Sequence, residues 1–223
     1  MYNPSDKSLM INRDDAPQPL GARAQSKERN RQKILESAMT LFRERGFEAA
    51  TLRDIARGAG LSTGALFANF ADKNEIFLTV VEDENARVIR LMRDGYDESL
   101  GLVDRLHKQL MRGYDAAQAN ARLILSAFVM RWSASQPSLT EISRLSDLVR
   151  VTLLDTLKAA KARKEIPDTA RIDCAAEILE DLCFANLRRA FQSSEEGAGF
   201  DVSQLADSLS MQIGLVVAGL KTV

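Results

Sequence analysis

The sequence predicts an all-α protein of about nine helices, with a three-helix head at the N-terminus followed by a larger helical bundle. Three observations support this prediction. Apolar residues recur at intervals of three and four along most of the 223 residues. Side chains that cap helix N-termini stand directly before several of these stretches. Gly60-Leu61-Ser62 is the whole connection between two of them, which is short enough to predict a helix-turn-helix pair.

The N-terminal segment and the first helix differ sharply in composition. Residues 1–25 are rich in proline and polar side chains, so we expect a flexible arm. A helix is predicted from about Lys27 to Arg45, and Gly46 then ends it. Its apolar stripe consists of Ile34, Leu35, Ala38, Leu41 and Phe42. We expect this stripe to cover the two short helices that follow.

The first of these short helices is predicted by its two ends. Thr51 and Asp54 form a capping box that starts a helix at Leu52. Gly60 suits the left-handed position that commonly ends a helix, and Ser62 can cap the next helix two residues later. A turn this short forces the two helices into contact.

The second short helix should pack on the first through Leu66 and Phe70, which lie four residues apart. The side chains that then face outward or toward the rim are Thr63, Gly64, Ala65, Phe67 and Asn69. This side of the helix is small and uncharged, which suits an element that enters a DNA major groove about 12 Å wide.

A long helix is predicted from the capping box of Asp72 and Glu75 to the region of Gly95, with Lys73 at its first position. It would connect the head to the bundle. Later in the chain, apolar residues recur at the spacing of a helix throughout. We predict helices near 103–119, 121–134, 138–165, 170–193 and 202–220. Asp201 with Gln204 should cap the last one.

Charge is distributed unevenly along the chain. The formal net charge is −1, but residues 23–73 hold ten basic and six acidic side chains, a net of +4 that leaves −5 for the remainder. A basic head on an acidic body favours phosphate at one end only. Ordinary solvated helix faces are the alternative explanation of the same charges.

Several classes of site are not predicted. Cys174 and Cys183 are nine residues apart in a helical pattern, so they point in opposite directions and cannot pair within one helix. His107 is the one histidine, and neither a metal-ligand cluster nor a nucleotide-binding loop is present, so we expect no cofactor. No apolar run approaches the roughly 20 residues of a membrane span, and we expect a cytoplasmic, nucleoid-associated protein. Its thiols should be reduced, with a redox-sensing cysteine as the minor alternative.

Residues 27–80 resemble the tetracycline-repressor (TetR) family of bacterial transcription regulators. The resemblance is carried by Thr51-Leu52-Arg53-Asp54-Ile55-Ala56, by Ala59-Gly60-Leu61-Ser62-Thr63-Gly64-Ala65-Leu66-Phe67-Ala68-Asn69-Phe70, and by Lys73. The chain departs from the family at Phe67 and Asn69, where a tyrosine and a histidine are usual. Loss of the tyrosine hydroxyl removes one phosphate contact, while Asn69 keeps groups that could reach a base or a phosphate.

The resemblance implies a ligand-responsive homodimeric DNA-binding regulator, more often a repressor than an activator, which a small molecule releases from a palindromic operator. It implies a helix-turn-helix domain over 26–73 and an effector-binding and dimerisation domain over 74–223. The DNA-binding residues would be Thr51, Arg53, Ser62, Thr63, Gly64, Ala65, Phe67, Asn69 and Lys73. Of these, Thr51 and Lys73 would contact phosphate.

The body should hold a small-molecule pocket and a dimer interface. Aromatic and methionine side chains in its middle helices are usually core, but the resemblance makes them candidates for an effector pocket: Met92, His107, Met111, Tyr114, Phe128 and Trp132. The last two helices have apolar faces wider than one neighbour covers, which predicts a four-helix bundle between two chains. The interface residues would be Leu179, Cys183, Leu187, Leu209, Ile213, Val216 and Val217.

Two other functions are compatible with parts of the sequence. Gly60-Leu61-Ser62-Thr63-Gly64 matches the G-x-S-x-G pattern of serine hydrolases, but that chemistry needs a strand before Ser62 and a histidine beside it. The residues before Gly60 have a helical pattern, so we predict that the protein is not an enzyme. The second alternative is a DNA-binding architectural or division factor without a small-molecule effector, which a body without a closed cavity would favour.

Overall fold

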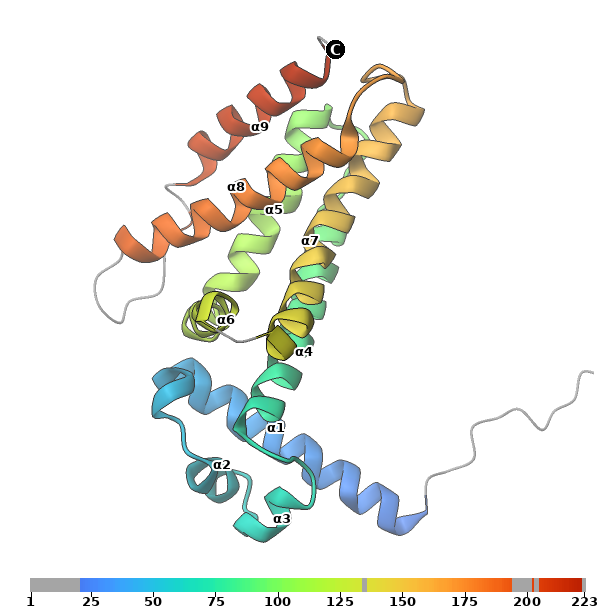
Figure 1. Ribbon diagram of the computed structural model, residues 1–223. Coiled ribbons are helices and arrows are strands. Elements are labelled where there is room, and N and C mark those ends of the chain that lie inside the picture. The colour runs from blue at the N-terminus through green and yellow to red at the C-terminus, as the bar shows by residue number, and fades with distance from the viewer. Residues whose placement is uncertain (1–20, 134–135, 194–201, 203–204, 222–223) are drawn as a thin grey trace, which may run out of the picture.

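The computed structural model describes residues 21–133, 136–193, 202 and 205–221, without the side chains of residues 22, 128, 131–133, 136–146 and 193. All regular structure in these residues is helical, as predicted (Figure 1). Residues 1–20 of the predicted arm and the predicted cap formed by Asp201 and Gln204 lie outside the described residues. None of the helices in the described residues has the length and apolar character that would let it cross a membrane.

Nine helices occur in the described residues. They are α1 (Ala22–Ala49), α2 (Leu52–Gly58), α3 (Thr63–Phe67), α4 (Lys73–Asp94), α5 (Leu102–Gln118), α6 (Ala121–Ser133), α7 (Gln136–Ala162), α8 (Ile172–Ser193) and α9 (Ala206–Lys221). Figure 1 shows α1 to α3 gathered as a head below the body, and α4 running from the head into the body. The order and number of the helices agree with the prediction.

Helix α1 is longer than the sequence predicted. It begins at Ala22 rather than near Lys27, so the last residues assigned to the arm are helical. Gly46 interrupts it with φ 77° and ψ 173°, which is where the end of the apolar stripe predicted a stop. A positive φ of this size strongly favours glycine, because it brings a Cβ atom too close to the backbone.

The predicted caps of the short helices are confirmed. The Thr51 side chain accepts a hydrogen bond from the Asp54 N–H, and the Ser62 hydroxyl accepts one from the Ala65 N–H at 3.1 Å. Gly60 has φ 66°, which matches the left-handed conformation expected between the two helices. Because both ends are fixed by side-chain and backbone bonds, α2 and α3 keep one relative orientation despite their short length.

The core of the head extends beyond the three predicted helices. Its buried residues from α1 to α3 are continuous with Ile76, Phe77, Val80 and Val81 of α4 and with Leu123 of α6. The predicted domain boundary after Lys73 therefore cuts through one packed cluster. The first two turns of α4 belong to the head by packing, and α6 reaches it from the body.

The body has a second core, formed by the rest of α4 with α5, α7, α8 and α9. Helix α9 packs on α5 and α8, and α8 packs in turn on α7. Figure 1 shows α8 and α9 side by side at the outer side of the body, away from the head. The molecule thus has two hydrophobic cores that meet where α4 and α6 approach α1.

Candidate nucleic-acid interface and ligand cavity

The outward side of α3 has the small, uncharged surface that the sequence predicted. Thr63 and Gly64 are exposed, Ala65 is half-buried, and Phe67 is 52% exposed. Leu66 on the opposite side is fully buried and holds α3 on α1 and α2. The helix therefore presents a hydroxyl, a glycine, a methyl group and an aromatic ring to an incoming groove.

Helix α2 adds a cation beside this surface. Arg53 is exposed, and its guanidinium has no hydrogen-bond or ion-pair partner within the part of the chain that the structure describes. Arg57, one turn later, is paired with Asp54 instead. The pKa of the Asp54 carboxyl is lowered, first because the Thr51 side chain donates to it and then because Arg57 lies close. Arg53 is therefore free to bond a base or a phosphate, while Arg57 already has a partner.

The Thr51 and Ser62 hydroxyls, both predicted to contact DNA, differ in whether their proton is still free to be donated. The Thr51 hydroxyl donates to Asp54 Oδ2 at 2.8 Å while it accepts from the Asp54 N–H, so its proton is used. The Ser62 hydroxyl accepts from Ala65 N, and its proton has no acceptor in the described residues. Ser62 can therefore donate to a phosphate without giving up its role as a cap.

Asn69 is turned inward in this conformation. Its side-chain Nδ2 donates to the Ala65 carbonyl at 2.8 Å, and its Oδ1 is buried without a partner. Arg31 donates to the Asn69 carbonyl at 3.3 Å, and its guanidinium lies 4.2 Å from the centre of the Phe70 ring. The amide that was predicted to reach DNA is thus engaged with the backbone of α3, and contact with a base would require it to rotate outward.

Lys73 fixes the junction between α1 and α4. Its Nζ donates to the carbonyls of Phe47, Glu48 and Ala50 at 2.9, 3.4 and 3.2 Å, and lies 4.2 Å from the centre of the Phe47 ring. These three bonds use all three ammonium protons. A phosphate at Lys73, as the sequence predicted, would have to replace at least one carbonyl.

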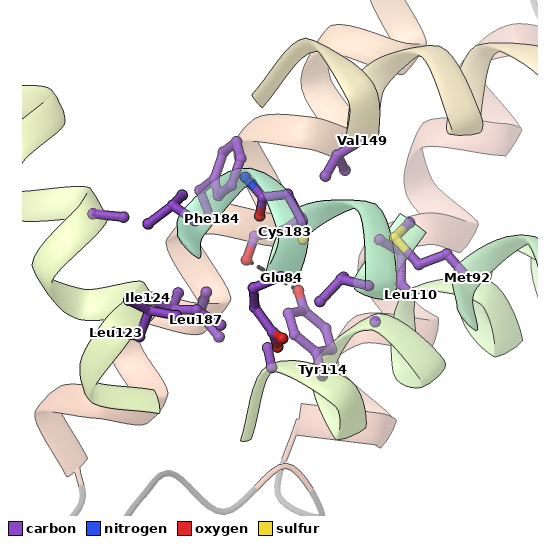
Figure 2. A pocket seen from close by; sticks show the side chains of 16 residues that line it. Glu84, Met92, Leu110, Tyr114, Leu123, Ile124, Val149, Cys183, Phe184 and Leu187 are labelled. Atoms are coloured by element: carbon purple, nitrogen blue, oxygen red, sulfur yellow. Dashed lines mark hydrogen bonds between the residues drawn. The ribbon is translucent and has the colours of Figure 1, made fainter. Parts of the chain in front are cut away.

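The body contains an apolar cavity of about 100 Å³ between α4, α5, α6, α7 and α8. Figure 2 shows side chains from these helices converging on it, with Glu84 and Tyr114 near its centre. It is lined by Val81, Glu84, Asn85, Val88, Met92, Leu110, Gly113, Tyr114, Ala117, Leu123, Ile124, Ala127, Val149, Cys183, Phe184 and Leu187. A buried apolar space with few polar groups is the usual form of a small-molecule site.

Two of the predicted pocket residues, Met92 and Tyr114, line this cavity. The Tyr114 hydroxyl donates to the Cys183 carbonyl at 3.1 Å, a bond that ties α5 to α8 (Figure 2). Burial raises the pKa of Tyr114 well above its ordinary value. Burial likewise raises the pKa of the Cys183 thiol to about 11. Both groups are therefore neutral at physiological pH.

Of the other predicted pocket residues, His107 and Met111 do not line the cavity. His107 lies at a different place on α5, where its Nε2 is 3.0 Å from the Ala206 carbonyl at the start of α9. Met111 is half-buried and packs against the core of the body. Phe128 and Trp132 belong to α6, but their side chains lie outside the described part of the chain. A methionine or aromatic pattern on one helix does not show which neighbour each side chain faces.

The polar groups of the cavity were missed by the sequence analysis. Glu84 is 3% exposed, and its carboxylate receives two bonds from Arg87, at 2.9 Å to Oε2 and 2.6 Å to Oε1. Arg87 also donates to the Ala116 carbonyl at 2.7 Å. Asn85 lines the cavity next to this pair, and its amide has no partner among the described residues. The signal was available as a glutamate in line with Ile76, Val80 and Val81 on an apolar helix face.

Most residues of the predicted dimer interface are already covered within one chain, and the interface itself stays a prediction. Within one chain Leu209, Ile213 and Leu179 are fully buried, and Val217 and Leu187 are nearly so. Val216 and Cys183 are half-buried, and Cys183 and Leu187 line the cavity instead. The apolar stripe of α9 is covered by α5 and α8 of the same chain, a partner that periodicity alone cannot identify.

A different apolar surface remains exposed on α8 and α9. Met211 and Leu215 are each 71% exposed, and Ile178 is 44% exposed. Met211 and Leu215 are four residues apart, so they share one face of α9 on the side opposite its buried stripe. We refer to these three side chains, Ile178 of α8 and Met211 and Leu215 of α9, as the exposed face.

Head and cavity share part of their walls. Val81 of α4 and Leu123 of α6 are buried in the core of the head and also line the cavity. Ala127 of α6 packs against the head and faces the cavity as well. Close by, the Ser126 hydroxyl accepts a hydrogen bond from the Phe47 N–H at 3.3 Å, and Arg122 donates to the Glu44 carbonyl. Helix α6 therefore contributes to the wall of the cavity and is hydrogen-bonded to the last turn of α1.

The groups required for hydrolase chemistry do not come together. Ser62 follows helix α2 rather than a strand, and it belongs to the head. His107 lies in α5 of the body and is bonded to Ala206. Within the described residues there is also no group of three or more His, Cys, Asp or Glu side chains that could hold a metal ion.

Comparison with known proteins extends beyond the head. A family model described as "Bacterial regulatory proteins, tetR family" matches residues 34–80. The HTH-type transcriptional repressor AcnR of Corynebacterium efficiens is 30% identical over 145 residues, which cover 62% of this chain and 71% of AcnR. The HTH-type transcriptional repressor KstR2 of Mycobacterium tuberculosis is 26% identical over 159 residues, or 71% of this chain and 80% of KstR2.

Solved structures show the same fold at lower identity. The fatty acid degradation regulator FadR from Bacillus halodurans superposes with a TM-score of 0.68 at 15% identity, covering 82% of this chain and 94% of FadR. SmeT, the repressor of the Stenotrophomonas maltophilia multidrug efflux pump SmeDEF, superposes with a TM-score of 0.63 at 19% identity, covering 85% and 89%. The likeness covers both the head and the body.

Proposed function

Because the chain belongs to the TetR family of bacterial regulatory proteins, we propose that it binds a palindromic operator as a homodimer and leaves it when a neutral apolar molecule fills the cavity. The chain is a helix-turn-helix transcriptional regulator with a DNA-binding repressor role, as its relatives are. The identity of the operator contacts, the dimer face and the ligand class are the proposed parts.

The proposed DNA contacts come from α2 and α3. Arg53 is the exposed, unpaired cation beside the uncharged face of α3, so it is assigned to a guanine or a phosphate. The Thr63 and Ala65 methyl groups and the Phe67 ring are assigned to apolar base surfaces such as thymine methyl groups. The Ser62 hydroxyl is assigned to phosphate. Thr51 and Lys73 act mainly as structural caps, because their protons are already donated inside the head.

The proposed dimer forms through the exposed face of Ile178, Met211 and Leu215. Twofold symmetry lets one patch meet itself, so a single apolar face is enough for an isologous interface. Two heads held by such an interface would meet half-sites one helical turn of DNA apart, which is about 34–36 Å, or a multiple of that distance.

The proposed switch is carried by one observation: Leu123 is at once part of the head core and part of the cavity wall. A ligand that pushes on α6 moves the packing under α1, and so changes the pitch or spacing of the two heads. The effect on operator affinity cannot exceed the difference between the ligand's affinities for the two arrangements, typically about 1–3 kcal/mol.

The ligand class follows from the charges of the cavity. Glu84 is the one carboxyl side chain among the described lining residues, and both of its oxygens are bonded to Arg87. The Glu84 carboxylate would repel an anionic ligand, and no described lining residue offers that ligand an unpaired cation. A neutral apolar molecule with one hydrogen-bonding group suits the site, because the Asn85 amide is free to bond that group.

Operator binding is tested first and without ligand. Random duplexes are selected with the purified full-length protein, and fluorescence anisotropy then compares the selected site with a scrambled one. Arg53→Ala should reduce the preference for the selected site by about tenfold or more, as loss of one base contact does. Arg57→Ala is the matched control, because this arginine is on the same helix but paired with Asp54, and it should keep the preference. Equal preference in Arg53→Ala and wild type would remove the assigned base contact.

Ligand response is tested separately on the selected operator. Alcohols and carboxylates of equal chain length are titrated into the complex, and the alcohol should release DNA at concentrations at least tenfold lower. In Glu84→Gln the repelling charge is lost and Arg87 is freed, so the carboxylate should approach the alcohol in potency. Operator binding without release by any neutral compound would contradict the switch while leaving the DNA-binding role intact.

A further inference from the structure

A second cleft of about 340 Å³ lies between the end of α4, α5 and α7. It shares no lining residue with the apolar cavity, and adjacent residues on α4 separate the two, since Met92 faces the cavity and Arg93 the cleft. Most of its exposed lining surface is apolar, but six of its seven lining side chains carry a polar group. The lining residues are Arg93, Tyr96, Gln109, Thr152, Asp155, Thr156 and Ala159. The volume falls within the usual range for small-molecule sites, about 300–1,000 Å³.

The floor of the cleft is formed by polar side chains that are buried. Gln109 and Thr152 are each 2% exposed, and Thr156 is 3% exposed. The Thr156 hydroxyl donates to Gln109 Oε1 at 2.8 Å, and the Thr152 hydroxyl donates to the Leu148 carbonyl at 2.9 Å. Burying three polar side chains on facing helices is unfavourable unless their hydrogen-bonding groups find partners.

The Gln109 amide nitrogen is the unpartnered group on this floor. Its Nε2 has no hydrogen-bond acceptor among the described residues, whereas Oε1 is bonded to Thr156. In the described chain, the fully enclosed side-chain atoms that lack a hydrogen-bond partner are Asn69 Oδ1 and Arg105 Nε. Gln109 Nε2 is not one of them, so this nitrogen is not fully enclosed by the protein. Gln109 therefore presents N–H donors to the cleft from a rigid, nearly fully buried position.

Two opposite charges stand at the rim of the cleft. Arg93 is exposed and has neither a hydrogen bond nor an ion pair in the part of the chain described. The Asp155 carboxylate lies 3.7 Å from Lys158 Nζ, and both side chains are 58% exposed, so that pair is weak. A free guanidinium and an almost free carboxylate thus flank the buried amide.

We propose that this cleft binds a small zwitterion of the α-amino acid class, as a site separate from the apolar cavity and beyond the proposed function. Its carboxylate accepts hydrogen bonds from Arg93 and Gln109 Nε2, since a guanidinium and an amide are suitable donors to it. Its ammonium group pairs with Asp155 at the rim. An apolar molecule does not suit the cleft, because it would cover the buried amide without bonding it.

The proposal is tested by isothermal titration of the full-length protein with the twenty common L-amino acids. At least one should bind, and its deaminated carboxylic acid and its decarboxylated amine should each bind at least tenfold more weakly. Arg93→Gln should weaken binding by at least tenfold without affecting folding, because the side chain is exposed. Gln109→Leu should do the same, and thermal denaturation checks that it folds. Arg90→Gln, on an exposed position of the same helix, is the matched control and should bind as wild type does.

Three results would overturn the proposal. The first is that no amino acid binds at 10 mM, roughly the weakest affinity of interest for such a site, which would leave only water in the cleft. The second is equal binding by the wild type, Arg93→Gln and Arg90→Gln. The third is competition by a saturating neutral alcohol, which would place the amino acid in the apolar cavity. Operator binding is measured in the same samples, so failure of this site is separated from failure of the regulator.

Discussion

At the scale of single residues, Lys73 shows how one ammonium group can serve the fold of the head. It bonds three carbonyls where α1 ends and lies over the Phe47 ring. Lys73→Ala should lower the free energy of unfolding by about 1–3 kcal/mol, because those carbonyls lose their partner. Chemical denaturation measures this loss.

The same variant distinguishes a cap from a phosphate contact. Loss of one phosphate contact flattens the dependence of operator affinity on salt by about 0.9 in log–log slope. We expect the slope of Lys73→Ala to stay unchanged, measured at temperatures where the variant is folded. A flatter slope with unchanged stability would instead support the phosphate contact that the sequence predicted.

The two cysteines should differ strongly in reactivity. Burial raises the pKa of the Cys183 thiol to about 11, so at pH 8 about one molecule in a thousand carries the thiolate that alkylating reagents need. Cys174 is exposed. Iodoacetamide followed by mass spectrometry should therefore label Cys174 first, and Cys183 should remain protected until the protein unfolds. Rapid labelling of Cys183 at pH 8 would contradict a buried thiol in the cavity wall.

At the scale of elements, Gly64 separates stability from DNA binding. It lies in α3 with no positive φ, and a Cβ added there would meet only the Ser62 hydroxyl, at 3.9 Å. Gly64→Ala should stabilise the head by roughly 0.5–1 kcal/mol through helix propensity. It should at the same time weaken operator binding, because the new methyl group lies on the exposed face of α3.

Gly60→Ala is the matched comparison on the other side of the turn. Gly60 has φ 66° with nothing within 4 Å of an added Cβ, so alanine there should cost about 1 kcal/mol through backbone strain alone. Thermal denaturation and anisotropy on the same samples test both variants. A destabilised Gly64→Ala would show that α3 is not the helix described.

The sequence was informative about elements wherever a local chemical signal marks an end. The caps at Thr51, Ser62 and Asp72 and the turn at Gly60 were predictable, because the bonds that define them join residues two to four positions apart. The start of α1 at Ala22 was not, since no capping side chain precedes it. Local signals thus predict helix order and most helix ends.

Contacts between helices were predicted less well, because they depend on the rotation of each helix. The apolar stripe of α9 was identified, but its contacts with α5 and α8 of the same chain were not. On α5, Tyr114 faces the cavity while His107 faces α9. Periodicity identifies a buried side without naming its neighbour, so the sequence analysis found Met92 and Tyr114 but not the cavity residues of α8.

At the scale of the whole molecule, the exposed face of Ile178, Met211 and Leu215 predicts how the assembly can be dissociated. Met211→Glu with Leu215→Glu should convert a dimer to a monomer without loss of helix, because both side chains are 71% exposed in one chain. Sedimentation velocity and circular dichroism measure the two effects. Leu209→Glu is the contrast, since this residue is fully buried and its substitution should unfold the chain.

The monomeric variant should also separate half-site from full-site binding. Its affinity for a single half-site should match that of the wild type, while its affinity for the palindrome falls, since the second contact is no longer intramolecular. A double variant that remains dimeric would move the interface to another surface.

Because Leu123 belongs both to the core of the head and to the wall of the cavity in the body, this regulator cannot be divided into interchangeable parts at the end of its helix-turn-helix. A chimaera that takes residues 1–73 from a relative would set a foreign α1 against the native α6. The two surfaces would no longer fit, and such a hybrid could recognise its new operator yet ignore its inducer. Grafts that carry α1 to α3 together with the first turns of α4 and the facing side of α6 should keep both properties, so the unit that evolution can exchange is discontinuous in the sequence.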